Sequence, residues 1–514
     1  MRQKGTGNVW KKTVDFISDK KIAAVMAGML ALSLVPILYL AGYARPSGDD
    51  YGYSVFTHAA WLDTHSLVEV FKAAADTVKG MYQAWNGDWF TVFLFSLMPE
   101  VFAPYTFWIV PYFMVGVTVL GTTVFLHDVL VETAGIGREY AVILDALVLI
   151  ASFQFIPSTA IGMYWYVGAM HYMVPHAVAL FALVSGFRYY RTGKIRYIVY
   201  ASLCMFMVGG SSYFSSLLVF MVYGMMMVLF FRKRKDILFL LIPFFIGAAG
   251  FVVQCVSPGN KARGGESFGF SIGGAFLTVA QSLWQGLVTP VDYLREKTFI
   301  YVILLLCAIF GWTALLKRKG KMSFRFRYPL LFVLFMYGIY SAMYAPAIYA
   351  AVDVSLGPAT MVYLTFLLTA LLSILYVEGW IIRNMQEGGN GRLGRLRFRK
   401  VLLDAGSYRA RVGAPLLFLA AVLTLFCGGS LRNCVDKQVY DYVSSGQAED
   451  FRKQIASQME ILLDDSVKEA YLVPINNDQG PLMHMPVTED EEAFTNRVVR
   501  DFYRKDRVVM ITEP

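Results

Sequence analysis

Long apolar runs alternate with short polar segments along most of the chain. A helix of about 17–25 apolar residues is long enough to cross the hydrocarbon core of a bilayer. The pattern therefore predicts an all-α polytopic membrane protein with about 11 transmembrane helices within residues 22–430. The expected spans are Ile22–Tyr43, Pro104–Val131, Tyr140–Ile156, Met173–Phe187, Tyr197–Val208, Tyr213–Phe231, Ile237–Val256, Phe299–Leu316, Pro329–Tyr344, Ala359–Trp380 and Val412–Gly429.

Composition and charge place this chain in a membrane and orient it. The 514 residues are 57% hydrophobic and only 16% charged, whereas soluble domains carry about a quarter charged residues. A net charge of +9 would suit nucleic acid, but the basic residues follow the expected topology. The N-terminus and alternate loops hold 29 Lys and Arg, against 7 in the opposite loops. The positive-inside rule then predicts a multi-pass plasma-membrane protein with residues 1–21 in the cytoplasm and no nucleic-acid partner.

The same topology places residues 44–103 outside, as a long first external loop. Within it, apolar residues recur at helical spacing, which predicts one amphipathic helix. Two interpretations stay open, because such a helix lies along the membrane interface or packs on the spans. The predicted apolar face consists of Leu67, Val70, Phe71, Ala74, Val78, Met81, Tyr82 and Trp85.

Three further external segments carry polar or aromatic chemistry. Residues 157–175 hold Trp165 and three Tyr between two prolines, which fits a re-entrant or cavity-lining loop but equally an interfacial aromatic belt. Residues 256–274 are Gly-rich and carry Lys261 and Arg263; they form an anion-binding loop or a flexible connector. Residues 431–514 contain the strand-like runs EAYLVPI and RVVMI, and they predict a small extracytoplasmic α+β appendage.

Asp49 and Asp50 begin the stretch DDYGYS, a few residues beyond the first span. Ionised carboxylates gain nothing from nearby lipid, so the pair has another role. Three roles remain open on residue chemistry alone: capping the following helix, binding a cation, or acting as a general base.

Several short motifs in this arrangement resemble the GT-C superfamily of membrane glycosyltransferases. The chain is also similar to a family of largely uncharacterised bacterial GT-C-like membrane proteins. The first external acid pair and PGN-x-x-R are the most specific of these motifs. The resemblance rests on DDYGYS (49–54), NGDWFTVFLFSLMP (86–99), WYVGAMHYMVP (165–175), SPGNKAR (257–263), YAPAIYA (344–350) and FTNRVVRDFY (494–503).

The resemblance implies an inverting transfer of a sugar from a polyprenyl-phosphate donor to a glycan or lipid acceptor outside the cell. It implies that Asp49 or Asp50 is the base, with Asp50 favoured here. Phosphate-binding groups would be Lys261, Arg263 or Arg45, because Asp88 stands where relatives often have a basic residue. Tyr164, Trp165 and Tyr166 would stack on sugar rings, and His171 would assist. No cofactor or metal is required, although paired carboxylates are compatible with a divalent cation.

Two rival functions follow from other features. Asp145 lies well within a predicted span, and intramembrane acids are costly and often functional. It favours an ion-coupled transporter or flippase of a lipid or glycan precursor. The appendage instead favours a non-catalytic envelope assembly protein.

Overall fold

The computed structural model describes residues 18–264, 269, 271–318, 324–350, 354–387, 399–426, 428–476 and 479–511. Within these ranges the chain is mostly helical, and its one sheet has two strands. Most of the predicted cytoplasmic segment, residues 1–21, lies outside the described residues.

Eight helical segments in the described part are long and apolar enough to cross a membrane, which supports the predicted polytopic class. They are Asp19–Tyr43 (α2 and η1), Ile109–Thr133 (α6 and η3), Tyr166–Thr192 (α8), Tyr213–Phe230 (α10), Lys235–Cys255 (η5 and α11), Phe299–Leu316 (α14), Leu356–Gln386 (most of α17, Leu356–Glu387) and Ala405–Phe426 (α19, η8 and α20).

Three of the eleven predicted spans form shorter helices. The helix α7 (Arg138–Gln154) has 17 residues, while α9 (Arg196–Gly209) and α15 (Pro329–Ala342) have 14 each. At 1.5 Å per residue, 14 residues cover about 21 Å, less than the ~30 Å hydrocarbon core. The helix α9 stops at Gly210, where a turn reverses the chain into α10. A count of eight long helices is therefore what the geometry supports directly.

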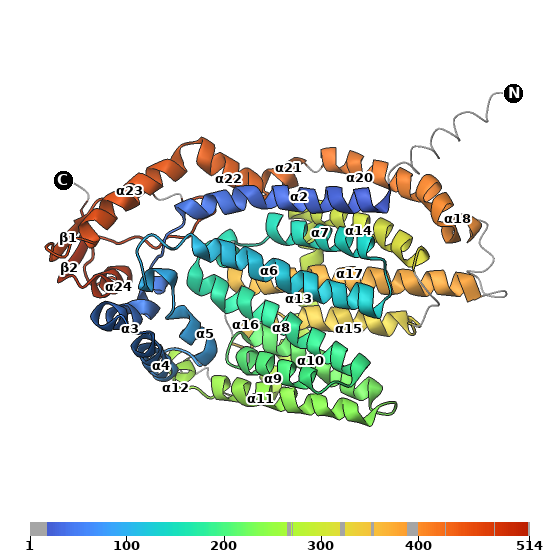
Figure 1. The fold of residues 1–514 in the computed structure, drawn as a ribbon, viewed down its shortest axis with the longest axis horizontal. Coiled ribbons are helices and arrows are strands. Elements are labelled where there is room, and N and C mark those ends of the chain that lie inside the picture. The colour runs from blue at the N-terminus through green and yellow to red at the C-terminus, as the bar shows by residue number, and fades with distance from the viewer. Residues whose placement is uncertain are drawn as a thin grey trace.

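The long helices run side by side and form one bundle (Figure 1). At its centre, α7 packs against α2, α6, α14 and α17. Small residues allow close approach elsewhere. A Cβ on Gly209 of α9 would come within 2.5 Å of the Gly247 carbonyl of α11, so these two backbones are nearly in contact.

One end of the bundle carries the loop of residues 44–103, α12 and the C-terminal residues; we call it the appendage end (Figure 1). The loop folds into α3, α4, α5 and η2, rather than into one helix. The bounds of these elements and of four others are α3 (Asp49–Thr64), α4 (Leu67–Ala84), α5 (Trp89–Phe95), η2 (Pro99–Val101), η4 (Ala160–Tyr164), α12 (Pro258–Gly264), α13 (Ile272–Glu296) and α16 (Ala345–Tyr349).

The predicted amphipathic helix is α4. Val70 and Ala74 are buried where α4 packs on α3, α5 and α12. Leu67 and Phe71, from the same predicted face, remain exposed. This helix therefore packs on the protein with one part of its apolar surface and leaves another part open.

Two segments between predicted spans are more helical than the sequence indicated. Residues 166–175, expected in a loop, form the first turns of α8, and Pro175 lies inside that helix. The region between the seventh and eighth predicted spans contains α13, a 25-residue amphipathic helix. Its exposed face includes Phe276 and Trp284, while Thr278 and Ser282 are buried. Its mixed composition, with polar residues on the inner face, hid it from a search for uniform apolar runs.

The C-terminal appendage (residues 435–511) has the predicted mixture of helix and strand. The strands β1 (Glu469–Leu472) and β2 (Arg507–Met510) correspond to the two strand-like runs, and they pair in parallel. The helix α24 (Phe494–Phe502) lies between them in the chain and packs on α3. The remaining helices near this region are α21 (Gly428–Arg432), α22 (Val435–Ser444) and α23 (Gln447–Leu462), and α18 (Arg399–Leu403) lies at the other end.

Candidate functional site

The two neighbouring acids at the start of α3 have different surroundings. Asp50 is fully buried, and its oxygens accept the backbone N–H groups of Ser47 at 3.1 Å and Val167 at 3.0 Å. Burial raises the pKa of Asp50 to about 8, although these two N–H groups oppose the rise. Because Val167 lies in the first turn of α8, Asp50 ties the start of α3 to the start of α8. Its carboxylate is occupied by backbone.

Asp49 is only partly buried, and its carboxylate has no hydrogen bond or ion pair within the described ranges. Partial burial raises its pKa above the ordinary value. Gly48, the preceding residue, has φ +38°, a conformation that glycine adopts readily. After the turn at Gly48, Asp49 keeps a free carboxylate within the described ranges, whereas Asp50 points into the protein.

Asp88 lies between α4 and α5 and is 7% exposed. One carboxylate oxygen accepts the amide of Asn86 at 3.1 Å, and the other accepts the amide of Gln254. Burial raises the pKa of Asp88, while His171, Gln254 and Arg263 oppose the rise. The residue that departs from the expected pattern is therefore a buried acid held by two neutral amides.

His171 of α8 lies beside Asp88. Its Nδ1 is 3.8 Å from Asp88 Oδ2, and its side chain is 18% exposed. His171 follows Val167 by four residues, so it lies one turn along the helix face that Asp50 caps. The imidazole packs edge-on against Tyr172, with 4.6 Å between ring centroids, and near Phe95 at 6.2 Å.

The motif SPGNKAR forms an anchored turn and the short helix α12. Ser257 donates to the carbonyl of Tyr82 at 2.6 Å, and Asn260 donates to the carbonyl of Gln254 at 2.8 Å. Arg263 is exposed, and its guanidinium lies 5.0 Å from the centroid of the Trp85 ring. Lys261 is exposed on the same helix.

Tyr53 links these groups across three segments of chain. It follows Asp49 by one helical turn and packs on Phe95 at 5.0 Å, in a cluster that Trp165 also contacts. Burial raises the pKa of Tyr53, the charges of Asp49 and Asp88 raise it further, and Arg263 opposes them. The charges of both carboxylates and of the guanidinium therefore act on Tyr53, which packs in the aromatic cluster. We call Asp49, Tyr53, Asp88, His171 and Arg263 the acid–base cluster.

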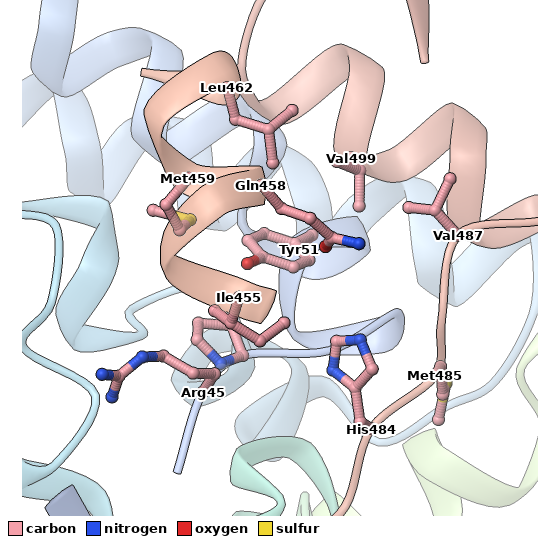
Figure 2. Close-up of a pocket in the computed structure, with 11 residues that line it drawn as sticks. Arg45, Tyr51, Ile455, Gln458, Met459, Leu462, His484, Met485, Val487 and Val499 are labelled. Atoms are coloured by element: carbon pink, nitrogen blue, oxygen red, sulfur yellow. The ribbon is translucent and has the colours of Figure 1, made fainter. Parts of the chain in front are cut away.

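Two predicted site residues lie elsewhere. Tyr164 is 1% exposed and donates to the carbonyl of Ile37 at 2.9 Å, inside the bundle. Arg45 lines a small cavity between α3 and the appendage with Tyr51 and His484 (Figure 2). That cavity is about 20 Å³, the space of roughly one water molecule, and is too small for a sugar. Arg45 also opposes the burial that raises the pKa of Glu100 to about 7.

The sequence therefore grouped Asp49, Trp165, His171 and Arg263 with Tyr164 and Arg45, which lie apart from them. It did not include Tyr53 or Asp88 among the predicted site residues. Both omitted residues fall within motifs that the resemblance had marked, DDYGYS and NGDWF. Among the described residues, no group of three or more His, Cys, Asp or Glu side chains is arranged to hold a metal ion.

Comparison with known proteins adds no assignment, because neither a protein-family model nor a curated protein matches this chain.

Proposed function

We propose that this protein is a membrane glycosyltransferase that moves a sugar from a polyprenyl-phosphate donor to a hydroxyl acceptor at the appendage end. The observation that carries the proposal is the acid–base cluster, in which the charges of an unpaired carboxylate, Asp49, and of an exposed guanidinium, Arg263, both act on Tyr53. A transfer from a phosphate ester needs these two kinds of group, one to take a proton and one to stabilise the departing phosphate.

In this scheme Asp49 is the general base. As the acceptor oxygen attacks the anomeric carbon, its proton passes to Asp49 and the new C–O bond forms. The bond between that carbon and the phosphate oxygen breaks on the opposite face, and the electron pair leaves with the phosphate, which inverts the anomeric configuration. Asp50 is less suited to this role, because both its oxygens already accept backbone N–H groups.

Arg263 is the proposed phosphate-binding cation, with Lys261 beside it on α12. Guanidinium groups bind phosphate oxygens through two parallel hydrogen bonds, which fixes the ester as well as stabilising its charge. The Trp85 ring under Arg263 holds the guanidinium near the cluster. Asn260 anchors α12, because its side-chain amide donates to the backbone carbonyl of Gln254. The side chain of Gln254 in turn donates to Asp88.

The location suits a lipid-linked donor. Moving a polyprenyl chain into water would cost about 0.8 kcal/mol per CH₂, so the reacting phosphate must stay at the membrane boundary. We infer that α7, α9 and α15 also cross or enter the bilayer, which gives the eleven-segment topology. The excess of basic residues in alternate loops then puts the N-terminus in the cytoplasm and the acid–base cluster at the outer surface.

The test is turnover of polyprenyl-phosphate-linked radiolabelled sugars by the full chain in membranes, comparing wild type with Asp49→Asn. Asp76→Asn is the matched control, since Asp76 is an exposed acid on α4 in the same loop. We expect transfer by the wild type and the control and its loss in Asp49→Asn. Equal transfer by all three proteins would remove Asp49 from the chemistry.

One observation favours the transporter as a second candidate. Asp145 accepts a hydrogen bond from Thr123 at 2.6 Å, and its other oxygen is buried without a partner within the described part of the chain. A second acid, Glu378 of α17, is also buried among helices. Solute uptake into proteoliposomes that depends on a proton gradient, and is lost in Asp145→Asn, would favour transport over transfer.

A further inference from the structure

The side chains of α13 are arranged in the reverse order of those on a helix in water. Its buried residues include Thr278, Ser282 and Gly286, on the side that packs against α15 and α16. Its exposed side includes Phe276, at 75% exposure, and Trp284, at 64%. A helix in water buries its apolar residues and exposes its polar ones. The arrangement of α13 therefore fits an apolar medium on its outer side.

The exposed apolar residues of α13 share one side of the helix, which we call the apolar side. Its principal members recur four or seven positions apart, the spacing of neighbours along a helix face. They are Phe276, Leu283, Leu287 and Leu294. Leu331 and Leu334 of α15, on which α13 packs, are also exposed, so the apolar surface includes a second helix.

A third side of α13 is polar and is neither packed nor apolar. Its members recur at spacings of four and seven, and most of them are exposed; they are Gln281, Gln285, Asp292 and Glu296. The 20 residues from Ile272 to Val291 contain no charged side chain. A helix with one apolar and one polar side, packed on a membrane protein along the third, is typical of the plane where lipid tails meet head groups.

Both ends of α13 lie on the same side of the bundle. Lys297, just after the helix, donates to the carbonyl of Phe155 at 2.8 Å, and the neighbouring Gln154 donates to Asp436 of the appendage at 2.8 Å. The other end, Ser271, is seven residues from Gly264 of α12, which lies at the appendage end (Figure 1). Seven residues reach at most about 25 Å, less than the ~30 Å hydrocarbon core. The helix α13 therefore does not cross the bilayer.

We propose that α13 lies in the plane of the membrane at the appendage end, with lipid acyl chains covering its apolar side and lipid head groups facing Gln281 and Gln285. Its 25 residues make it about 37 Å long. Lipid is at hand, because α14, one of the eight candidate spans, begins at Phe299 directly after α13. This placement goes beyond sugar transfer and does not depend on it, and it adds membrane-embedded surface without adding a span.

The test places nitroxide spin labels on single cysteines of the full chain in vesicles of phosphatidylcholine and phosphatidylglycerol. The five native cysteines are replaced by alanine. Phe276→Cys and Leu283→Cys report on the apolar side, and Gln281→Cys and Gln285→Cys are matched controls on the same helix. Tyr440→Cys, on α22 of the appendage, is the reference for water. All five positions are exposed, so the labels displace no packed side chain.

Collision with oxygen, which concentrates among acyl chains, is compared with collision with a water-soluble nickel complex. We expect nickel collisions to be lost at Phe276 and Leu283 and retained at Gln281, Gln285 and the water reference. Hydroxyl-radical oxidation of wild type in the same vesicles gives a second reading without any substitution. It should leave Trp284 protected and oxidise Tyr440.

Three results would overturn the placement. Nickel collisions at Phe276 and Leu283 as strong as at Tyr440 would put the apolar side in water. Loss of nickel collisions at Gln281 and Gln285 as well would put the whole helix in the hydrocarbon core. Spin–spin broadening at Leu283 that disappears on dilution with unlabelled protein would make a second copy of the chain, rather than lipid, the cover of this side. Sugar transfer is measured separately, and its absence would leave these results unchanged.

Discussion

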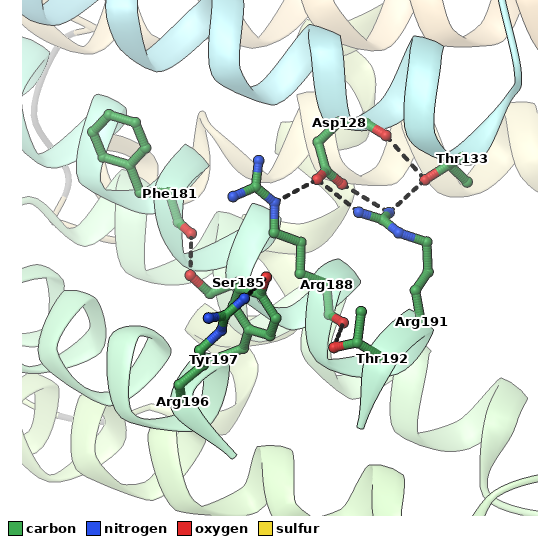
Figure 3. A network of polar contacts seen from close by, with 9 residues as sticks. All are labelled: Asp128, Thr133, Phe181, Ser185, Arg188, Arg191, Thr192, Arg196 and Tyr197. Carbon is green, nitrogen blue, oxygen red and sulfur yellow. Dashed lines mark hydrogen bonds and ion pairs between the residues drawn. The ribbon is translucent and has the colours of Figure 1, made fainter. Parts of the chain in front are cut away.

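Two buried aspartates at opposite ends of the bundle show how differently the same side chain is used. Asp128, at the C-terminal end of α6, accepts from Arg188 at 2.8 Å and from both terminal nitrogens of Arg191 at 2.7 and 2.8 Å (Figure 3). Arg191 also donates to Thr133 at 2.7 Å. Both oxygens are thus saturated by guanidinium groups, and the network joins α6 to α8.

Asp88, at the appendage end, has no hydrogen bond from a guanidinium group among the described residues. Two neutral amides hold it, and the His171 ring lies 3.8 Å away. A carboxylate that is fully neutralised by neighbouring cations has little left to offer a ligand, whereas one held only by dipoles still exerts its charge. The comparison teaches that two equally buried acids can differ in the charge of their partners, which burial alone does not reveal.

The sharpest way to test this contrast is to remove the charge at Asp128. Asp128→Asn leaves two guanidinium groups facing an amide, and breaking a buried ion pair in this way costs about 3 kcal/mol of unfolding free energy. Arg188 and Arg191 are partly exposed, so we take the lower end of the usual range. Denaturant unfolding in detergent measures the change. A loss below about 1 kcal/mol would mean that the network is not a clamp.

The same substitution at Asp88 should affect stability less. Asp88→Asn keeps one acceptor but turns an amide donor toward Asn86 or Gln254, at a cost of about 1–2 kcal/mol. The same unfolding assay applies, with Asp76→Asn as a control that should change nothing. A destabilisation as large as that of Asp128→Asn would place both acids in the same structural class.

Asp50 extends the comparison to pH. Its pKa is raised to about 8 in the folded protein, so the folded state holds a proton that the unfolded state has released above its ordinary pKa near 4. Stability contributed by this group is present at low pH and is lost as the pH rises toward 8. Thermal unfolding at pH 5 and pH 8 should therefore show a lower midpoint at pH 8.

In Asp50→Asn the difference between the two midpoints should become smaller, with the remainder due in part to Glu100, whose pKa is raised to about 7. An unchanged difference would show that Asp50 is ionised in the folded protein. At pH 5 the substitution removes one acceptor from Ser47 or Val167, which should cost about 1 kcal/mol.

The smallest effect is expected where an ion pair is exposed. Arg504 of the appendage contacts Asp63 of α3 at 2.8 Å, with both side chains about half exposed, and it also donates to the Ala59 carbonyl. Arg504→Ala should lower stability by less than about 1 kcal/mol and become undetectable at high salt. A larger effect would mean that this contact holds the appendage on α3.

The sequence was sufficient to predict the apolar helices and the two strands of the appendage, because both depend on local periodicity. It favoured Asp50 over Asp49 as the base and did not indicate that Asp50 is the acid whose oxygens accept backbone N–H groups. That distinction depends on the backbone N–H of Val167, which is 117 residues away and becomes a donor to Asp50 only in the folded bundle. Apolar periodicity also missed α13, because its inner face is polar and its outer face is apolar.

The neighbourhood of Asp88 was out of reach for the same reason. Its partners Gln254 and His171 come from different helices, and no local pattern indicates that they meet. What the sequence offered was the position of Asp88 within NGDWF, where a basic residue was expected. The unexpected negative charge singled out Asp88 in the sequence, but only the folded structure shows that Gln254 and His171 lie beside it.

The hydroxyl of Tyr503 donates to that of Tyr51 across 452 positions of sequence. At about 5–20 residues per second, a ribosome needs roughly half a minute to a minute and a half to make that stretch. During this interval α3 has emerged but lacks the helix that covers it. The nascent chain therefore carries Asp49 on α3 before α24 is made. The acid–base cluster can reach its final packing only after α24 has been translated.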